Sequence, residues 1–317
     1  MTQISCRALA PLACALAALG ASDAALAHGF AGKRFFPATL ATDDPFVADE
    51  LSLPTVSRIR SPATDEDPVT TTTTTAVDFT KRITPDFGVG LGTSHLRISP
   101  EGGGTVSGAD NLALSLKYQF HKNEEHESIA SVGLDADIGD TGAKRVGAES
   151  FGTLMPAVFY GKGLGDLSEG MKYLRPLAFT ATAGIAMPMR SSTTTFDADG
   201  NASVERHPDV LQVGFAVQYS LPYLQSFVKD VGLGEPFNRM IPLIEFSLAK
   251  PLDRGRGPFT GTANPGVLWA GRTMQLGIER IIPMNDRSGG YGWIAQIHFF
   301  MDDLFPKSIG RPIYGSR

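Results

Sequence analysis

Residues 111–120 read N-L-A-L-S-L-K-Y-Q-F, and every second side chain of this stretch is large and apolar. Side chains of a β-strand point alternately to opposite faces of the sheet. One face of the expected strand is therefore leucine-rich and ends in Tyr118 and Phe120, whereas the other face carries small and polar residues such as Lys117. The stretch predicts a strand that separates an apolar environment from a polar one.

The same alternation recurs along the chain in about ten to twelve segments. Their second faces are rich in Gly, Ser, Thr, Gln and charged residues. Two segments are weaker, because Pro54 interrupts the first of them and residues 151–160 are apolar on both faces. The expected strands lie in residues 51–59, 69–83, 87–91, 111–120, 130–138, 151–160, 177–187, 211–219, 244–248, 274–278 and 291–299, with 307–314 as a short last strand.

Charged residues on the second faces argue against a dry core, because burying an unpaired charge costs several kcal/mol. The cost disappears if the apolar face meets lipid and the polar face meets a watery lumen. Closing the sheet also satisfies every backbone group, as hydrocarbon demands. We therefore predict an all-β fold, a transmembrane antiparallel up-and-down β-barrel of about twelve strands, with ten as the alternative count.

Residues that alternation places inside this barrel are the candidate functional residues. In a channel they would set charge preference and bind passing solutes; alternatively, they pair with one another and plug the pore. The predicted lumen-lining residues are Asp78, Arg82, Lys117, Gln119, Asp135, Asp137, Gln212, Gln218, Glu245, Gln275, Glu279, Gln296 and His298.

An export signal is expected at residues 1–27. Arg7 supplies the positive start, a short apolar stretch follows, and A-L-A at residues 25–27 has the pattern of a cleavage site. Cleavage there removes Cys6 and Cys14, so the exported chain has no thiol. The expected location is the bacterial outer membrane, with outer-membrane lipids as partners.

The remaining chain divides into an irregular periplasmic arm, residues 28–49, and the barrel, residues 50–317. Two connections, 164–174 and 221–231, have helical spacing of apolar residues and predict short periplasmic amphipathic helices. The segments T-T-T-F at residues 193–196 and N-A-S-V at 201–204 flank Asp199-Gly200, which predicts a hairpin that rises above the membrane. Trp269 and Arg272 fall out of phase with the strand at 274–278, which predicts a bulge near Gly271.

The remaining connections set the predicted topology. Barrels of this class have short turns on the periplasmic side and longer loops outside. The expected periplasmic connections are 84–86, 121–127, the two helical connections and 283–289, and the expected outer loops are 60–68, 99–110, 139–150, 189–209 and 251–265.

Motifs for chemistry are weak in this sequence. Oxygen-bearing residues at 197–205 are spaced like calcium ligands, but Gly200 comes too early for an EF-hand. His121, Glu124, Glu125 and His126 have donor groups for a metal, yet a polar turn is the favoured interpretation. We predict no metal and no cofactor. The net charge of −5 and the lack of a basic cluster argue against a nucleic-acid partner.

Histidines inside expected strands leave a hydrolase as an alternative function. Neighbouring residues in a strand face opposite ways, so Ser94 cannot be activated by His95 directly, although a cross-strand partner remains open. His298 is the other strand histidine. No hydrolase motif accompanies either residue, and the sequence predicts no enzyme.

Several motifs resemble a known family. They are D-E-L-S-L-P at residues 49–54, F-T-K-R-I-T at 79–84 leading into Phe87-Gly88, and residues 266–306 with their D-D-L-F-P ending. Together they resemble the outer-membrane transporter barrels of the phenol-degradation meta-pathway type. The resemblance implies passive uptake of small molecules, apolar or aromatic compounds among them, and names no catalytic residue. The alternatives are the hydrolase and a closed structural or adhesion barrel; the sequence leaves the oligomeric state open.

Overall fold

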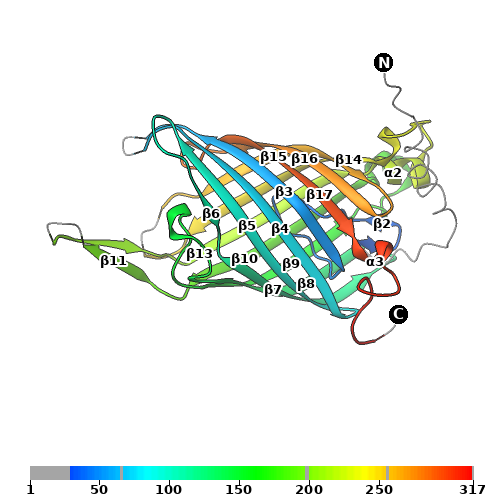
Figure 1. Ribbon diagram of the computed structural model, residues 1–317. Helices are drawn as coiled ribbons and strands as arrows, with labels where there is room; N and C mark the ends of the chain where they lie inside the picture. Colours follow the sequence, from blue (N-terminus) through cyan, green and yellow to red (C-terminus); the bar gives the residue numbers. More distant parts are fainter. Residues whose placement is uncertain (1–28, 65–66, 197–199, 255–256, 316–317) are drawn as a thin grey trace, which may run out of the picture.

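Twelve strands form the wall of a closed barrel (Figure 1). The computed structural model describes residues 29–64, 67–196, 200–254 and 257–315, so the predicted export signal lies outside the described residues. Each strand pairs antiparallel with the next, and β17 pairs with β3 to close the ring. The strands are β3 (Glu50–Ser61), β4 (Thr70–Thr84), β5 (Phe87–Pro100), β7 (Leu112–Asn123), β8 (Ser128–Ile138), β9 (Thr153–Gly163), β10 (Leu177–Pro188), β13 (Val210–Tyr219), β14 (Met240–Pro251), β15 (Thr260–Ala270), β16 (Met274–Pro283) and β17 (Tyr291–Phe300). The predicted transmembrane barrel is confirmed.

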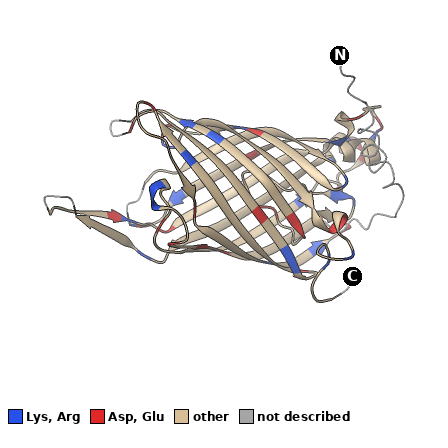
Figure 2. Cartoon of the chain, in the orientation of Figure 1, with Lys and Arg blue, Asp and Glu red and all other residues tan. Residues whose placement is uncertain are grey.

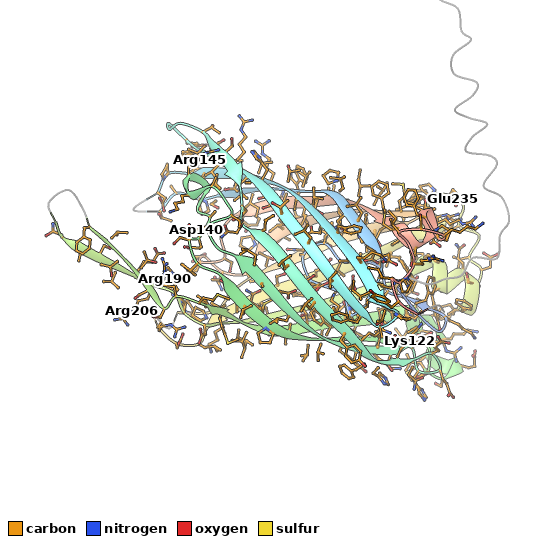
Figure 3. All side chains as sticks on the ribbon, turned by 60° about the horizontal axis from the view of Figure 1, so that its bottom comes forward. Lys122, Asp140, Arg145, Arg190, Arg206 and Glu235 are labelled. Atoms are coloured by element: carbon orange, nitrogen blue, oxygen red, sulfur yellow. The ribbon has the colours of Figure 1, made fainter. Side chains whose placement is uncertain are left out.

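The two ends of the barrel differ. The terminus end holds the first described residues and the C-terminal segment, and the loop end carries the longer loops (Figures 1 and 3). At the loop end β6 (Val106–Ala109) adds to β5, and the 3-10 turn η1 (Lys144–Val146) lies beside it. The predicted hairpin is confirmed there as β11 (Ser192–Phe196) paired with β12 (Ala202–Arg206), while Asp197 and Asp199, two of the residues with calcium-like spacing, lie outside the described residues.

The outer wall shows the alternation that the sequence predicts. On β7, Leu114 is 45% exposed and Phe120 is 58% exposed, whereas Gln119 on the opposite face is buried. Neighbouring strands continue this outward apolar surface with Val132, Leu134, Phe179 and Ile278. An outward apolar surface of this kind suits contact with lipid hydrocarbon, which the outer walls of transmembrane barrels face.

Four details of the predicted topology are wrong. Residues 260–270 form β15, although their sequence, T-G-T-A-N-P-G-V-L-W-A, has the composition of a loop. This strand completes the twelve and moves the connection at 283–289 to the loop end. The turn after β15 contains Gly271, so there is no bulge at that position. Residues 307–314 form no strand, because β17 and β3 already close the ring.

The predicted helices at residues 164–174 and 221–231 are present but shorter. The first connection contains η2 (Glu169–Leu174), and the second contains α2 (Leu221–Tyr223), the π-helical turn η3 (Leu224–Val228) and the 3-10 turn η4 (Phe237–Arg239). A last helical turn, α3 (Met301–Leu304), follows β17. None of the helices in the described residues is long and apolar enough to cross a membrane.

The N-terminal arm, residues 29–49, lies inside the barrel, whereas the sequence predicts an irregular periplasmic segment. It begins with the small hairpin β1 (Phe30–Ala31) and β2 (Arg34–Phe35) at the terminus end. Phe36 and Phe46 pack with Ile129 and other inward residues of the wall, and Leu40 packs in a second cluster with Ile241, Leu243 and Leu268. The arm lacks strand periodicity because the wall surrounds it, so its apolar residues contact different strands on different sides and not one flat face.

Candidate functional site

Glu245 of β14 fixes the arm inside the lumen. Its carboxylate accepts hydrogen bonds from the backbone N–H groups of Leu40, Ala41 and Thr42 at 2.8, 2.9 and 2.7 Å. It also accepts one from the Thr42 hydroxyl at 3.0 Å, and it is fully buried. Hydrogen bonds to a charged acceptor are stronger than neutral ones. One predicted lumen residue therefore determines the position of three consecutive arm residues.

Two further wall residues fit the arm closely. The side-chain amide of Gln275 donates to the carbonyl oxygen of Ala38 at 2.7 Å. Gly214 lies where a Cβ would come within 2.7 Å of the methyl group of Thr42, so any larger residue would collide with the arm. The wall of the lumen is thus shaped to receive this segment.

The cations of the lumen are neutralised by acidic residues of the arm. The ammonium of Lys117 lies 2.8 Å from Asp43 Oδ1 and also donates to the carbonyl oxygen of Asp44. Arg82 Nε lies 2.8 Å from Asp49 Oδ2. Without the arm Lys117 would lose Asp43, and Arg82 would keep only the more distant carboxylate of Asp302, 3.6 Å from its Nη2 atom.

At the terminus end a buried ion pair joins the arm hairpin to the wall. Arg34 Nε donates to Glu127 Oε2 at 3.1 Å, and both residues are at least 95% buried. The hydroxyl of Tyr223 donates to Glu127 Oε1 at 2.8 Å, and the Arg34 guanidinium lies 3.8 Å from the centre of the Tyr223 ring. Burial, together with the Glu127 carboxylate, raises the pKa of Tyr223 to about 12. This cluster anchors the start of the arm.

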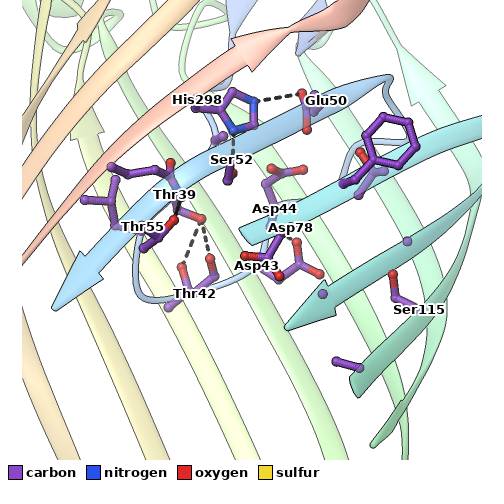
Figure 4. Close-up of a pocket in the computed structure, with 18 of the residues that line it drawn as sticks. Thr39, Thr42, Asp43, Asp44, Glu50, Ser52, Thr55, Asp78, Ser115 and His298 are labelled. Atoms are coloured by element: carbon purple, nitrogen blue, oxygen red, sulfur yellow. Dashed lines mark hydrogen bonds and ion pairs between the residues drawn. The ribbon is translucent and has the colours of Figure 1, made fainter. Parts of the chain in front are cut away.

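Between the arm and the wall lies a cavity of about 370 Å³ with an acidic lining (Figure 4). No lysine or arginine of the described chain lines it. Its acidic residues come from the arm and from three strands; they are Asp43, Asp44, Glu50, Asp78 and Asp135. A cavity lined by carboxylates and no cation favours cations over anions as occupants.

The acidic side of the lumen is also the side that water reaches. Asp78 and Asp137 occupy one row across the sheet, separated by Gly92 and Ala113 of the strands between them. Both aspartates are exposed, and neither forms an ion pair with another described residue. The small residues between them leave the space into which these carboxylates point.

The predicted lumen-lining residues fall into two groups by exposure. Those of the closed part of the lumen are buried against the arm or the residues around it; they are Arg82, Gln119, Gln218, Glu245, Gln275, Glu279, Gln296 and His298. Those of the open part are exposed or partly buried; they are Asp78, Asp135, Asp137 and Gln212, with Lys117 at the boundary because it pairs with Asp43 of the arm. Whether any of them contacts a solute stays a prediction.

His298 forms a small polar cluster at the edge of the acidic cavity (Figure 4). Its Nδ1 lies 2.9 Å from the Ser52 hydroxyl, and its Nε2 lies 3.6 Å from Glu50 Oε1. A hydroxyl, an imidazole and a carboxylate in this order are the components of a hydrolase triad. Ser52 and Glu50 lie at the start of β3, and no sequence signal pairs them with His298.

The other histidines considered from sequence lie elsewhere. His95 is on the outer face of β5, opposite in direction to Ser94. His121 contacts the Ser128 hydroxyl, and His126 contacts Asp166. A hydrogen bond from Lys162 holds the pKa of Asp166 below its ordinary value. Within the described ranges, no group of three or more His, Asp or Glu residues is arranged to hold a metal.

Sequence reasoning missed the contribution of the arm. Arg34, Asp43 and Asp49 belong to a segment without periodicity, and Glu127 lies in a turn. One signal was available: alternation places Arg82 and Lys117 inside the barrel, and buried cations require carboxylate partners. The acidic residues just before β3 are the nearest unassigned source of such partners.

Comparison with known proteins supports the fold. No family profile matches the chain, and no curated protein matches it. Among solved structures, an outer membrane channel from Pseudomonas putida F1 superposes with a TM-score of 0.55 at 12% identity, over 84% of this chain and 99% of that one. The β domain of the Bordetella autotransporter BrkA (TM-score 0.47, 10% identity, 80% and 100% covered) and the NanC porin (0.45, 10%, 78% and 98%) are more distant. The chain shares its architecture with outer-membrane β-barrels.

Proposed function

We propose that the protein is a channel of the bacterial outer membrane for the passive uptake of small molecules, and that the arm controls its conductance. The observation that carries the proposal is the set of hydrogen bonds between Glu245 and residues 40–42. A barrel that needed only to be sealed would be filled by side chains of its own strands. Here the occluding segment is a separate stretch of chain, held by polar contacts and two apolar clusters, so it can be displaced without unfolding a strand of the wall.

The charges of the lumen give this channel a preference for cations. Asp78, Asp135 and Asp137 have no ion pair among the described residues, whereas the wall cations Lys117 and Arg82 face carboxylates of the arm. Rings of carboxylates favour cations in a narrow pore. As solutes we propose small apolar or aromatic compounds, which rests on the resemblance of the motifs at residues 49–54, 79–84 and 266–306 alone.

The test is single-channel conductance in planar bilayers, with the mature chain compared with a variant that lacks residues 29–48. The intact protein should show small or brief openings and the shortened protein larger and longer ones, with cations preferred in both. If both proteins insert as folded barrels and neither conducts, the channel proposal fails. Heat-modifiable gel mobility shows that each barrel is folded.

A second candidate function, an embedded hydrolase, is favoured by the contact between Ser52 and His298. In such an enzyme Ser52 attacks an ester carbonyl while its proton passes to His298. The leaving alcohol takes that proton, and water then releases the acid from the acyl-serine. The assay is hydrolysis of short-chain nitrophenyl esters by the wild type, Ser52→Ala and His298→Gln, with His95→Gln as the outer-face control. Activity that is absent from the wild type, or unchanged in Ser52→Ala, excludes this function.

A further inference from the structure

Arginines gather on the outer face of the barrel at the loop end. On β16, Arg280 shares its face with the exposed Leu276 and Ile278, opposite to the inward Gln275 and Glu279. On β3, Arg58 and Arg60 are likewise exposed. Figure 2 shows basic positions near the loop ends of strands in this part of the wall. These side chains point toward the membrane and not toward the lumen.

The strand register places three of these arginines in one row. Arg280 pairs with Trp293, Trp293 with Arg58, Arg58 with Thr73 and Thr73 with Arg97. Adjacent strands lie about 4.8 Å apart, so successive arginines of this row are separated by about 10 Å. Arg60 lies one same-face step closer to the loops. The result is a basic patch across five neighbouring strands.

A groove of about 1030 Å³ lies over part of the patch, between the end of β3 and the turn that joins β16 to β17. Arg58, Arg60 and Arg280 line it together with the aromatic rings of Tyr291 and Trp293. Tyrosine and tryptophan concentrate where a barrel meets the headgroup region of the membrane. The groove is therefore at the level of lipid headgroups.

The arginines of the groove are available to a ligand. Arg58 and Arg280 form no ion pair with another residue of the described ranges, and Arg280 lies 5.9 Å from the centre of the Tyr291 ring. Arg60 pairs with Glu101 at 2.6 Å, but both side chains are more than half exposed, so the pair is weak. Asp286 is the acidic residue that also lines the groove. By contrast, Arg254 at the same end is neutralised by Asp209 and Asp253.

We propose that this groove binds the phosphorylated headgroup of the outer-leaflet glycolipid, lipid A. Guanidinium groups bind phosphate through paired hydrogen bonds, and several arginines about 10 Å apart suit a headgroup with more than one phosphate. The acyl chains would then follow the apolar surface below, where Ile278 is 54% exposed. The inference rests on the proposed outer-membrane location and does not depend on conductance.

The test is lipid binding by the purified full chain in non-ionic detergent, followed by native mass spectrometry. Lipid A with its two phosphates is compared with its dephosphorylated form and with inorganic phosphate as a competitor. The double variant Arg58→Gln/Arg280→Gln should weaken binding by about tenfold or more, which corresponds to a loss of about 1.4 kcal/mol. The affinity of Arg58→Lys/Arg280→Lys for lipid A should lie between those of the wild type and the double glutamine variant, because lysine keeps the charge but not the paired hydrogen bonds.

The matched control is Lys250→Gln, an exposed cation at the loop end of β14 that lies outside the groove. It should bind lipid A as the wild type does. Equal binding of both lipid forms, wild-type binding by the double glutamine variant, or displacement by millimolar inorganic phosphate would each overturn the proposal. Conductance of the same preparation is measured separately, so a failed lipid site and a failed channel are distinguishable.

Discussion

The closed and the open parts of the lumen are built from the same strands, yet they differ in what fills them. Gln212 and Gln218 both lie on the inner face of β13, and the first is exposed whereas the second is 2% exposed. This difference in exposure matches the position of the arm. The arm occupies the terminus half of the lumen, and its turn at Thr42 reaches β13 at Gly214, between the two glutamines. Strand alternation determines which residues face inward, and a separate segment determines which of them meet water.

Removal of the arm should have the largest effect on the difference between the closed and the open part of the lumen. A chain without residues 29–48 loses the plug together with Asp43 and Asp44, so Lys117 loses its acidic partner, whereas Arg82 keeps Asp49. Conductance should rise several-fold and cation preference should fall, measured as the reversal potential in a salt gradient. An unchanged conductance would show that something other than the arm limits flow.

Breaking the anchor at the terminus end should destabilise the folded barrel. In Arg34→Met the buried Glu127 carboxylate loses its cation, and such a loss costs about 3–5 kcal/mol. The measurement is urea-induced unfolding in detergent, followed by gel mobility. Arg239→Met is the control, because its pair with Glu235 is about half exposed and contributes at most about 1 kcal/mol. Equal effects of the two changes would contradict the anchor assignment.

Weakening the hydrogen bonds that hold the arm should have a smaller effect on conductance than deleting the arm. Glu245→Gln removes the charge that three arm N–H groups share, and each hydrogen bond to a charged group contributes about 1.5–3 kcal/mol. The fraction of time that single channels spend open should increase. The conductance of the fully open state should equal that of the protein without residues 29–48. Open times equal to those of the wild type would show that Glu245 does not hold the arm.

The smallest change in channel behaviour is expected from a substitution in the open part of the lumen. Asp137→Asn removes one exposed carboxylate that does not touch the arm, so opening should be unaffected while the preference for cations decreases by about twofold. Bi-ionic reversal potentials measure the preference. Altered gating without altered selectivity would place Asp137 in the wrong part of the lumen.

The sequence predicted the wall well and the plug not at all. Alternation at residues 111–120 and its repeats predicted eleven of the strands. The strand β15 was missed because its first residues, T-G-T-A-N-P-G, have the composition of a loop, and composition outweighs periodicity in a short segment. Glu245 and Lys117 were assigned to the lumen by parity alone. Their partners at residues 40–44 lack any periodic pattern, so only the three-dimensional structure brings them together.

The most direct test uses β13, whose two inward glutamines lie in the two parts of the lumen. The exported chain has no cysteine after the predicted cleavage, so Gln212→Cys and Gln218→Cys each introduce a single thiol. A water-soluble thiol reagent should modify the cysteine at position 212 at least about tenfold faster than that at 218, because reaction requires access. Deleting residues 29–48 should make the rates similar. Equal rates in the intact protein would contradict a lumen divided by the arm.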